Sequence, residues 1–236
     1  MSDWKPKRFW RKAIAAQTET GFTVLLDTRT VRTPAKAALT VPTMAMAEAI
    51  AAEWDAQGKL LDPATMPVTR GANAAIDKVS TQRAEVTALL AEYGESDLLC
   101  YRAAGPEALI AQQAQGWDPV LDWAASSLDA RLFVGEGVMH VPQTSQALQN
   151  LRAALDAFDN FELAAAHDLI AISGSLVLAL AVTRNALSAD QAWQLSRIDE
   201  DWQTSQWGED DEATKSALVK QQAFLDAAAF YNLCQA

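Results

Sequence analysis

The sequence predicts an α+β protein in which a small N-terminal antiparallel β domain precedes a larger, mainly α-helical domain. Short runs of β-branched and apolar residues, separated by Gly and Pro, fill the first 43 residues. Beyond them, apolar residues recur with the spacing of a helix. The net charge changes at the same place, from +5 over residues 1–43 to −16 over residues 44–236. We therefore expect domains at 1–43 and 44–236, with a boundary no later than about residue 70.

Four short strands are expected in the basic N-terminal region. The runs that carry the pattern are 9–15, 22–27, 31–33 and 38–41. Pro34 and Pro42 end the last two runs, because proline donates no hydrogen bond to a neighbouring strand. Strands at intervals of about ten residues indicate a small antiparallel sheet or a partial barrel.

Helical periodicity accounts for most of the remaining chain. Thr43 and Ser188 are suitable N-caps, and Gly58 and Gly94 are suitable stop signals. The expected helices are 43–58, 70–93, 106–116, 118–128, 143–156, 161–184, 188–205 and 209–234. Two apolar runs on either side of Gly135, at 131–134 and 137–141, predict a β-hairpin between them.

The composition bounds the class of protein. The chain has 236 residues, 50% of them hydrophobic, and a mean hydropathy of −0.05, which is typical of a soluble protein with its own core. A net charge of −11 argues against nucleic acid or an anionic membrane as the partner. The two cysteines, Cys100 and Cys234, are too few for a disulfide scaffold. The longest apolar stretch, 170–182, is too short to span a bilayer and predicts a buried helix. The first twelve residues lack the apolar segment of a secretory signal.

Few residues suggest catalysis or metal binding. The only histidines, His140 and His167, are far apart, and His167 falls on a predicted buried helix, where a core role is favoured. The two cysteines and two histidines have no zinc-ligand spacing, so no metal site is expected. No glycine-rich phosphate-binding loop is present. The serines at 173 and 175 lack the second glycine of a nucleophile elbow, and we interpret this segment as a place where two helices approach closely.

Acidic residues are concentrated near the C-terminal end. Seven acids and no base occur within fourteen residues, namely Asp199, Glu200, Asp201, Glu209, Asp210, Asp211 and Glu212. A calcium loop is excluded because Thr204 stands where an EF-hand needs glycine. Three interpretations stay open: a solvated helix start, a pair of catalytic carboxylates, and a protein interface. The neighbouring Trp202 and Trp207 favour the interface, because aromatic residues are enriched there. Other tryptophans, such as Trp54, Trp123 and Trp193, lie on apolar stripes and are expected in the core.

An ordered set of short strings resembles one known family, the chaperones that assemble F1-ATPase by binding its alpha subunit. The strings are RFWRK (8–12), GFTVLLD (21–27), VRTPAK (31–36), AIAAEWDAQ (49–57), DPATMPVTR (62–70), SDLLCYRA (96–103), WDPVLDW (117–123), SGSLVLALA (173–181) and WGEDDEA (207–213). Each is weak alone, but together they run in order along nearly the whole chain. The sequence departs from the family pattern at Thr28, where Gly is common, and at Gly71, where a larger apolar residue is usual.

The resemblance implies a non-enzymatic chaperone that needs no cofactor. Its partner would be the unassembled F1 alpha subunit, whose beta-facing surface it would shield. The resemblance also implies that an acid near the C-terminus matters for function. The candidate partner-binding residues are Glu200, Trp202, Trp207, Glu209, Asp210, Asp211 and Glu212, together with Glu53 and Trp54. For Trp54 a core role is favoured.

The location and assembly state are expectations as well. Eukaryotic members of the family are mitochondrial, and we expect this chain to be a bacterial, cytoplasmic, monomeric member that binds neither nucleic acid nor membrane. Two alternative functions stay open at this point. One is a hydrolase or lyase that uses carboxylates between residues 199 and 212. The other is a general binding module whose basic β region recognises an acidic partner through Arg29 and Arg32.

Overall fold

The structure, a computed structural model, describes residues 7–236 and divides into two compact units. The N-terminal unit comprises the chain up to Arg83 together with Asn160–Ala165 and Ala229–Ala236. The helical unit comprises Ala84–Asp159 and Ala166–Ala228. A domain boundary near residue 43 stays a prediction. Trp4 lies outside the described residues.

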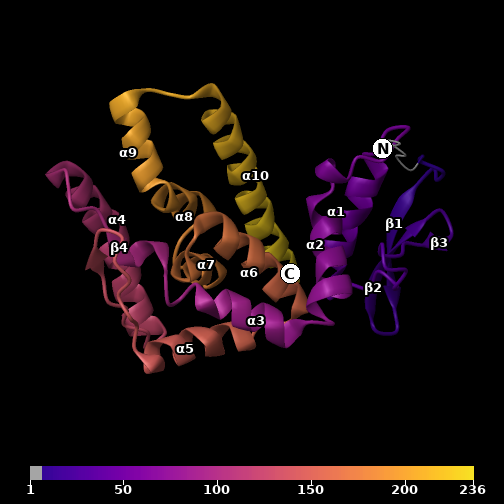
Figure 1. The fold of residues 1–236 in the computed structure, drawn as a ribbon. Coiled ribbons are helices and arrows are strands. Elements are labelled where there is room, and N and C mark those ends of the chain that lie inside the picture. The colour runs from indigo at the N-terminus through magenta and orange to yellow at the C-terminus, as the bar shows by residue number, and fades with distance from the viewer. Residues whose placement is uncertain (1–6) are drawn as a thin grey trace. The chain divides into compact units, whose positions relative to one another are not determined.

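An antiparallel sheet opens the N-terminal unit, as predicted (Figure 1). Its strands β1 (Ala13–Thr18), β2 (Gly21–Leu26) and β3 (Arg29–Thr30) are arranged in the order β1-β2-β3. Single bridges from Phe22 to Val41 and from Arg32 to Ala38 take the place of the longer third and fourth strands that the sequence predicted. The first strand also starts four residues later than expected, because Trp10 turns into the core instead of pairing along the sheet.

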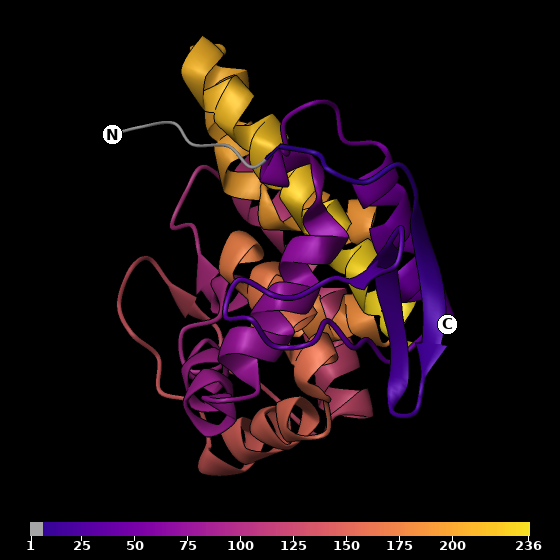
Figure 2. The ribbon, with the colours of Figure 1, turned by 90° about the vertical axis from the view of Figure 1, so that its right-hand side faces the viewer.

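Helix α1 (Met44–Asp55) packs against β1 and β2 (Figure 2). Thr43 caps it as predicted: its Oγ1 accepts a hydrogen bond from the Met46 backbone N–H at 3.1 Å. The same hydroxyl donates to the backbone carbonyl of Leu233 at 2.6 Å. The C-terminal residues of the chain are thereby tied to the start of α1.

The predicted helix over 70–93 is wrong in its continuity. A 3₁₀ turn, η1 (Pro63–Thr65), leads into α2 (Pro67–Ala74), which passes directly into a π-helical turn, η2 (Ala75–Val79). Ser80 and Thr81 then turn the chain before α3 (Arg83–Glu92). The periodicity of the apolar residues continues through this break, which is why the sequence gives no sign of it.

Helix α4 (Glu107–Ser127) replaces two predicted helices. Pro119 lies inside it instead of starting a new helix, and Gly116 does not end the first one. Gly116 serves packing instead, since a Cβ there would lie 2.8 Å from Ile198 Cδ1. The predicted hairpin after α4 is also wrong. A short 3₁₀ turn, η3 (Leu98–Cys100), leads into β4 (Tyr101–Arg102), which pairs in parallel with β5 (Gly135–Glu136).

The remaining helices are shorter than the sequence predicted. They are α5 (Ser145–Asp156), α6 (Asn160–Ser173), α7 (Leu176–Thr183), α8 (Ala189–Ser196), α9 (Ile198–Trp207) and α10 (Asp211–Cys234). Gly174, at φ +71°, separates α6 from α7, so the serines beside it are not within one helix. Seven of the eight residues of α7 are buried, in agreement with the predicted buried segment. Ser188 caps α8 with a full capping box, as predicted. No helix among residues 7–236 is long and apolar enough to cross a membrane.

Candidate partner-binding site

The predicted acidic cluster spreads over three different environments in the helical unit. Asp199 does not line the groove that several of the other acids border, and it bonds to α4 instead: its Oδ1 accepts a hydrogen bond from Gln113 Nε2 at 2.6 Å. The Gln113 side-chain oxygen accepts in turn from the Ala103 backbone N–H at 2.8 Å. Asp199 therefore fixes the start of α9 against α4.

Arg197 forms ion pairs with two further acids of the cluster, Glu200 and Asp201. Its Nη1 lies 3.0 Å from Glu200 Oε1, and its Nε lies 3.9 Å from Asp201 Oδ1. The guanidinium also stands over the Trp193 ring at 5.7 Å, and Trp193 packs against Phe224 of α10 at 6.1 Å. Arg197 lies between α8 and α9. It precedes Glu200 by three residues and Asp201 by four, so its side chain reaches both acids in the first turn of α9.

The remaining acids mark the start of α10. Gly208, at φ +89°, ends α9, and Asp210 Oδ1 then accepts from the Ala213 backbone N–H at 2.7 Å. Asp211 and Glu212 lie in the first turn, where negative charge is favoured by the helix dipole. This part of the cluster therefore has a capping role, as a solvated helix start would.

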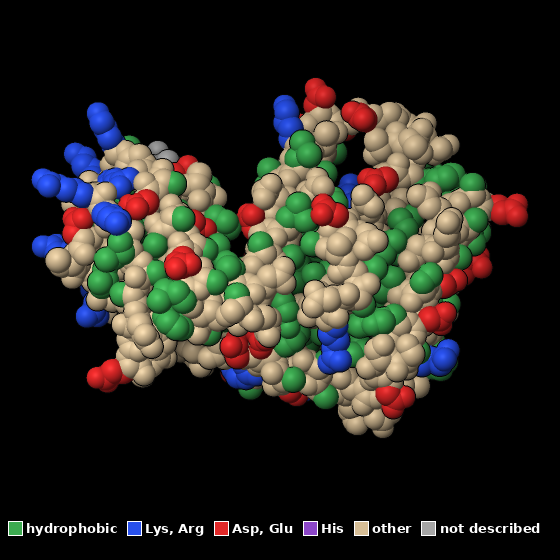
Figure 3. All heavy atoms as spheres, turned by 180° about the vertical axis from the view of Figure 1, so that it is seen from behind, with side chains coloured by type: hydrophobic (Ala, Val, Ile, Leu, Met, Phe, Trp, Pro, Cys, Tyr) green, Lys and Arg blue, Asp and Glu red, His purple; other side chains and the backbone are tan. Residues whose placement is uncertain are grey.

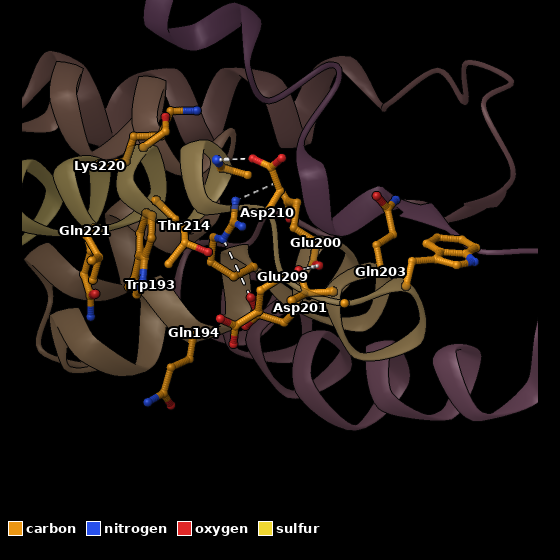
Figure 4. A pocket seen from close by; sticks show the side chains of 18 residues that line it. Trp193, Gln194, Glu200, Asp201, Gln203, Glu209, Asp210, Thr214, Lys220 and Gln221 are labelled. Carbon is orange, nitrogen blue, oxygen red and sulfur yellow. Dashed lines mark hydrogen bonds and ion pairs between the residues drawn. The ribbon is translucent and has the colours of Figure 1, made fainter.

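The α9–α10 groove is a hollow of about 690 Å³ between these elements (Figures 3 and 4). Glu200 and Asp201 border it from α9, and Glu209 and Asp210 from the connection to α10 (Figure 4). Its apolar lining residues are Trp193, Trp207, Ala213, Ala217 and Leu218. Two of them are well exposed, Trp207 at 81% and Leu218 at 60%.

Four of the seven predicted C-terminal site residues line this groove: Glu200, Trp207, Glu209 and Asp210. The other three, Trp202, Asp211 and Glu212, are not part of its lining. The groove thus combines exposed apolar surface with carboxylates at its edge. Binding a protein surface is what such an arrangement can do chemically.

The hydrolase or lyase hypothesis requires two carboxylates that face one enclosed substrate site. Glu200 and Asp201 on α9 and Asp210 in the connection to α10 are instead exposed, and each is engaged by Arg197 or by the backbone of α10. These three carboxylates already have partners within the protein, which does not favour a role in general acid–base work.

Comparisons with known proteins decide the family. A family model described as ATP12 chaperone protein matches residues 7–125, half of the chain. This chain belongs to the ATP12 chaperone family. It is 48% identical to Atp12 from Paracoccus denitrificans, with a TM-score of 0.94, over 97% of this chain and 98% of that one. An aspartate-to-lysine mutant of P. denitrificans Atp12p matches with a TM-score of 0.95 and 48% identity, over 99% and 100% of the two chains. The mitochondrial protein atp12 of Schizosaccharomyces pombe is 22% identical over 214 residues, which are 86% of this chain and 74% of that protein.

Glu53, the other predicted acid of this ATP12-family chain, holds α2 in place. Its carboxylate accepts from the Val68 and Thr69 backbone N–H groups at 2.6 and 2.8 Å, and from Thr69 Oγ1 at 2.6 Å. Burial raises the pKa of Glu53, and these hydrogen bonds oppose the rise. The neighbouring Trp54 is half-buried, with Trp10 edge-on at 5.0 Å. A role of either residue in partner binding stays a prediction.

Asp97 is a residue that sequence reasoning missed. It is fully buried, and its carboxylate accepts from Ser175 Oγ at 2.7 Å, from the Val177 N–H at 3.0 Å and from the Leu99 N–H at 3.1 Å. It therefore caps η3 and α7 together. Burial raises its pKa to about 6, against these bonds. The serine-glycine-serine segment of the ATP12-like string gains its meaning here, because Ser175 both caps α7 and bonds Asp97.

Two other expectations were tested by the structure. His167 is exposed beside Asp168, with 2.9 Å between Nδ1 and Oδ1, so the predicted core role is wrong. His167 and Asp168 lie on the side of α6 that is exposed to solvent. Cys100 is buried and free of any disulfide, and burial raises its pKa to about 12. A thiol of that kind stays protonated and unreactive.

Proposed function

We propose that this chain binds the unassembled alpha subunit of F1-ATPase and shields the surface that the beta subunit later covers. It acts by binding alone, without a catalysed reaction, as a monomer in the bacterial cytoplasm. Membership of the ATP12 chaperone family supports the chaperone role, and the family resemblance supplies the partner. The α9–α10 groove, where exposed apolar residues lie beside carboxylates, is the observation that supports particular residues as the contact site.

The groove suits a client of this kind on physical grounds. A subunit that awaits assembly exposes an apolar interface with a polar rim, and such patches aggregate. Trp207 and Leu218 offer apolar surface to cover it. Glu209 and Asp210, which have no ion-pair partner in the part of the chain that the structure describes, offer negative charge to a basic rim, which speeds encounter and orients the complex. Lys and Arg side chains gather instead on the N-terminal unit (Figure 3).

Co-purification from the native host tests the proposal. A tagged chain is expected to retain the F1 alpha subunit in stoichiometric amount, without the beta subunit. The association rate is expected to fall as ionic strength rises, because the contribution of the acids is electrostatic. Retention of a different partner, or of none, would contradict the proposal.

Charge reversal locates the contact. Glu209→Lys, at the edge of the groove, is expected to slow association with the alpha subunit several-fold, because rim charges act mainly on the on-rate. Glu48→Lys is the matched control, since Glu48 is an exposed acid on α1 and lies outside this groove. Equal association rates for both variants would remove the α9–α10 groove from the proposal.

A further inference from the structure

A second groove lies entirely within the N-terminal unit. It has a volume of about 520 Å³ and is formed by the segment around Pro34, the end of α1, and the η1–α2–η2 region. Its lining includes Arg32, Trp54, Arg70, Asn73, Asp77 and Lys78. We call it the Trp54 groove. Six of its thirteen lining residues are apolar, among them Trp54, Leu61 and Met66, and most of the exposed surface of the groove is formed by apolar atoms.

Three polar atoms on residues of the Trp54 groove have no hydrogen-bond partner. They are Trp54 Nε1, Asn73 Oδ1 and Asp77 Oδ1. Only six buried side-chain nitrogen or oxygen atoms among residues 7–236 are in this state, so half of them belong to one groove. Buried polar atoms without partners cost free energy, and native proteins keep few of them. Their concentration here indicates a site whose ligand supplies the missing partners.

Residues of the N-terminal unit pack against the groove from the protein side. Trp10 packs edge-on against Trp54, and Glu53 caps α2 through Val68 and Thr69. The second carboxylate oxygen of Asp77 accepts from the Ala35 backbone N–H at 3.0 Å. Asn73 and Asp77, four residues apart, lie where α2 passes into the π-helical η2. Such π-turns occur frequently at functional sites.

The chemistry of the groove matches an extended peptide. Trp54 Nε1 is a donor for a peptide carbonyl, and Asn73 Oδ1 and Asp77 Oδ1 are acceptors for peptide N–H groups. The apolar wall suits a hydrophobic side chain. The lining contains three bases, Arg32, Arg70 and Lys78, and one acid, Asp77. The resulting net positive charge favours a ligand that carries a carboxylate. In the present conformation the three unpaired atoms are covered, so a ligand reaches them only when these side chains turn.

We propose that the Trp54 groove binds an extended segment of the client chain in which an apolar side chain adjoins an acidic one. This makes the N-terminal unit a second recognition site, with the opposite charge preference to the α9–α10 groove. The identity of the client rests on the proposed function.

Titration with peptides, followed by NMR, tests the proposal directly. The probes are overlapping twelve-residue peptides that cover the F1 alpha subunit, added to the full ¹⁵N-labelled chain. The indole N–H resonance of Trp54 is assigned from its absence in Trp54→Phe. Peptides that contain an apolar–acidic pair are expected to shift this resonance. The same peptides with the acid replaced by lysine are expected to leave it in place. A Trp54 resonance that no peptide moves would overturn the proposal.

Variants carry the test to the intact subunit. Trp54→Phe keeps an aromatic ring but removes the pyrrole part of the indole with its N–H donor, so the affinity for the alpha subunit is expected to fall about 2- to 10-fold. Lys78→Glu is expected to weaken binding several-fold, whereas Lys59→Glu, an exposed base of the same unit outside the groove, is expected to leave it unchanged. Thermal unfolding of each variant shows whether the fold is kept.

The two proposals fail in different ways. A chain that retains no alpha subunit at all overturns the proposed function. A chain that retains it with equal affinity in Lys78→Glu, Lys59→Glu and Trp54→Phe overturns only the Trp54 groove.

Discussion

The two grooves differ in how far their polar groups are already paired. In the α9–α10 groove, Arg197 engages two of the acids and Asp210 caps a helix. In the Trp54 groove, an indole N–H and two side-chain oxygens have no partner. The acidic groove is conspicuous in the sequence because its charges are consecutive, whereas the other is assembled from residues between 32 and 78. A run of acidic residues in the sequence is therefore a weaker indication of a binding site than a buried polar atom that has no hydrogen-bond partner in the structure.

The comparison separates two kinds of substitution. Removing a polar group that the protein itself has paired should lower stability, because its former partners are left buried and unsatisfied. Removing a group that awaits a partner should change binding and leave the free energy of unfolding nearly as it was.

Asp97 is both fully buried and hydrogen-bonded through its carboxylate, and it should show the largest loss. Asp97→Ala leaves the Ser175 hydroxyl and the Leu99 and Val177 N–H groups without their acceptor. We expect the free energy of unfolding at pH 7 to fall by about 3–5 kcal/mol, measured by urea denaturation. Asp122→Ala, an exposed acid on α4, is the control and should change it by less than about 0.5 kcal/mol.

The pH dependence of Asp97 sharpens the same prediction. Its pKa is about 6 in the folded protein and near the ordinary 3.8 in the unfolded chain. Between these values the unfolded state binds fewer protons, so the free energy of unfolding falls as pH rises from about 4 to 6. The expected fall is about 3 kcal/mol. Asp97→Asn should lack this slope. A variant whose stability follows the same pH profile as the natural chain would refute the assignment.

Glu53 tests whether the loss of stability depends on the hydrogen bonds of a residue or on the structural unit in which it lies. It lies beside the Trp54 groove but is itself paired with the start of α2. Glu53→Gln exchanges one acceptor oxygen for an amide that faces N–H donors. We expect a loss of about 1–2 kcal/mol, measured by thermal unfolding. Glu48→Gln, exposed on the same helix, should be neutral. A loss as small as that of the control would break the comparison.

Trp207 should show the smallest effect on stability. Its side chain is 81% exposed, so Trp207→Ala removes little buried area and is expected to change the free energy of unfolding by less than about 0.5 kcal/mol. Binding of the alpha subunit should weaken about tenfold or more, as is common for an aromatic residue at an interface. Isothermal titration calorimetry measures it. An unchanged affinity would show that Trp207 does not contact the alpha subunit.

The sequence by itself determined the features whose causes are local. Thr43 and Ser188 cap helices as predicted, because a cap needs only the backbone two or three residues further on. The small N-terminal sheet, the mainly helical remainder and the buried α7 follow from periodicity over a few residues. The order of the family strings identified the family, since that order survives without any knowledge of contacts.

Only the tertiary structure decided where helices break or continue, and which polar atoms are paired. Helix α4 runs through Gly116 and Pro119, because packing against Ile198 and burial of Trp117 outweigh the local stop signals. Asp97 finds Ser175 and Val177, 78 and 80 residues away along the chain. The Trp54 groove likewise joins segments that are separated in sequence. Contacts of this kind depend on the packing of segments that are distant in the sequence. Local residue spacing and composition therefore do not predict them.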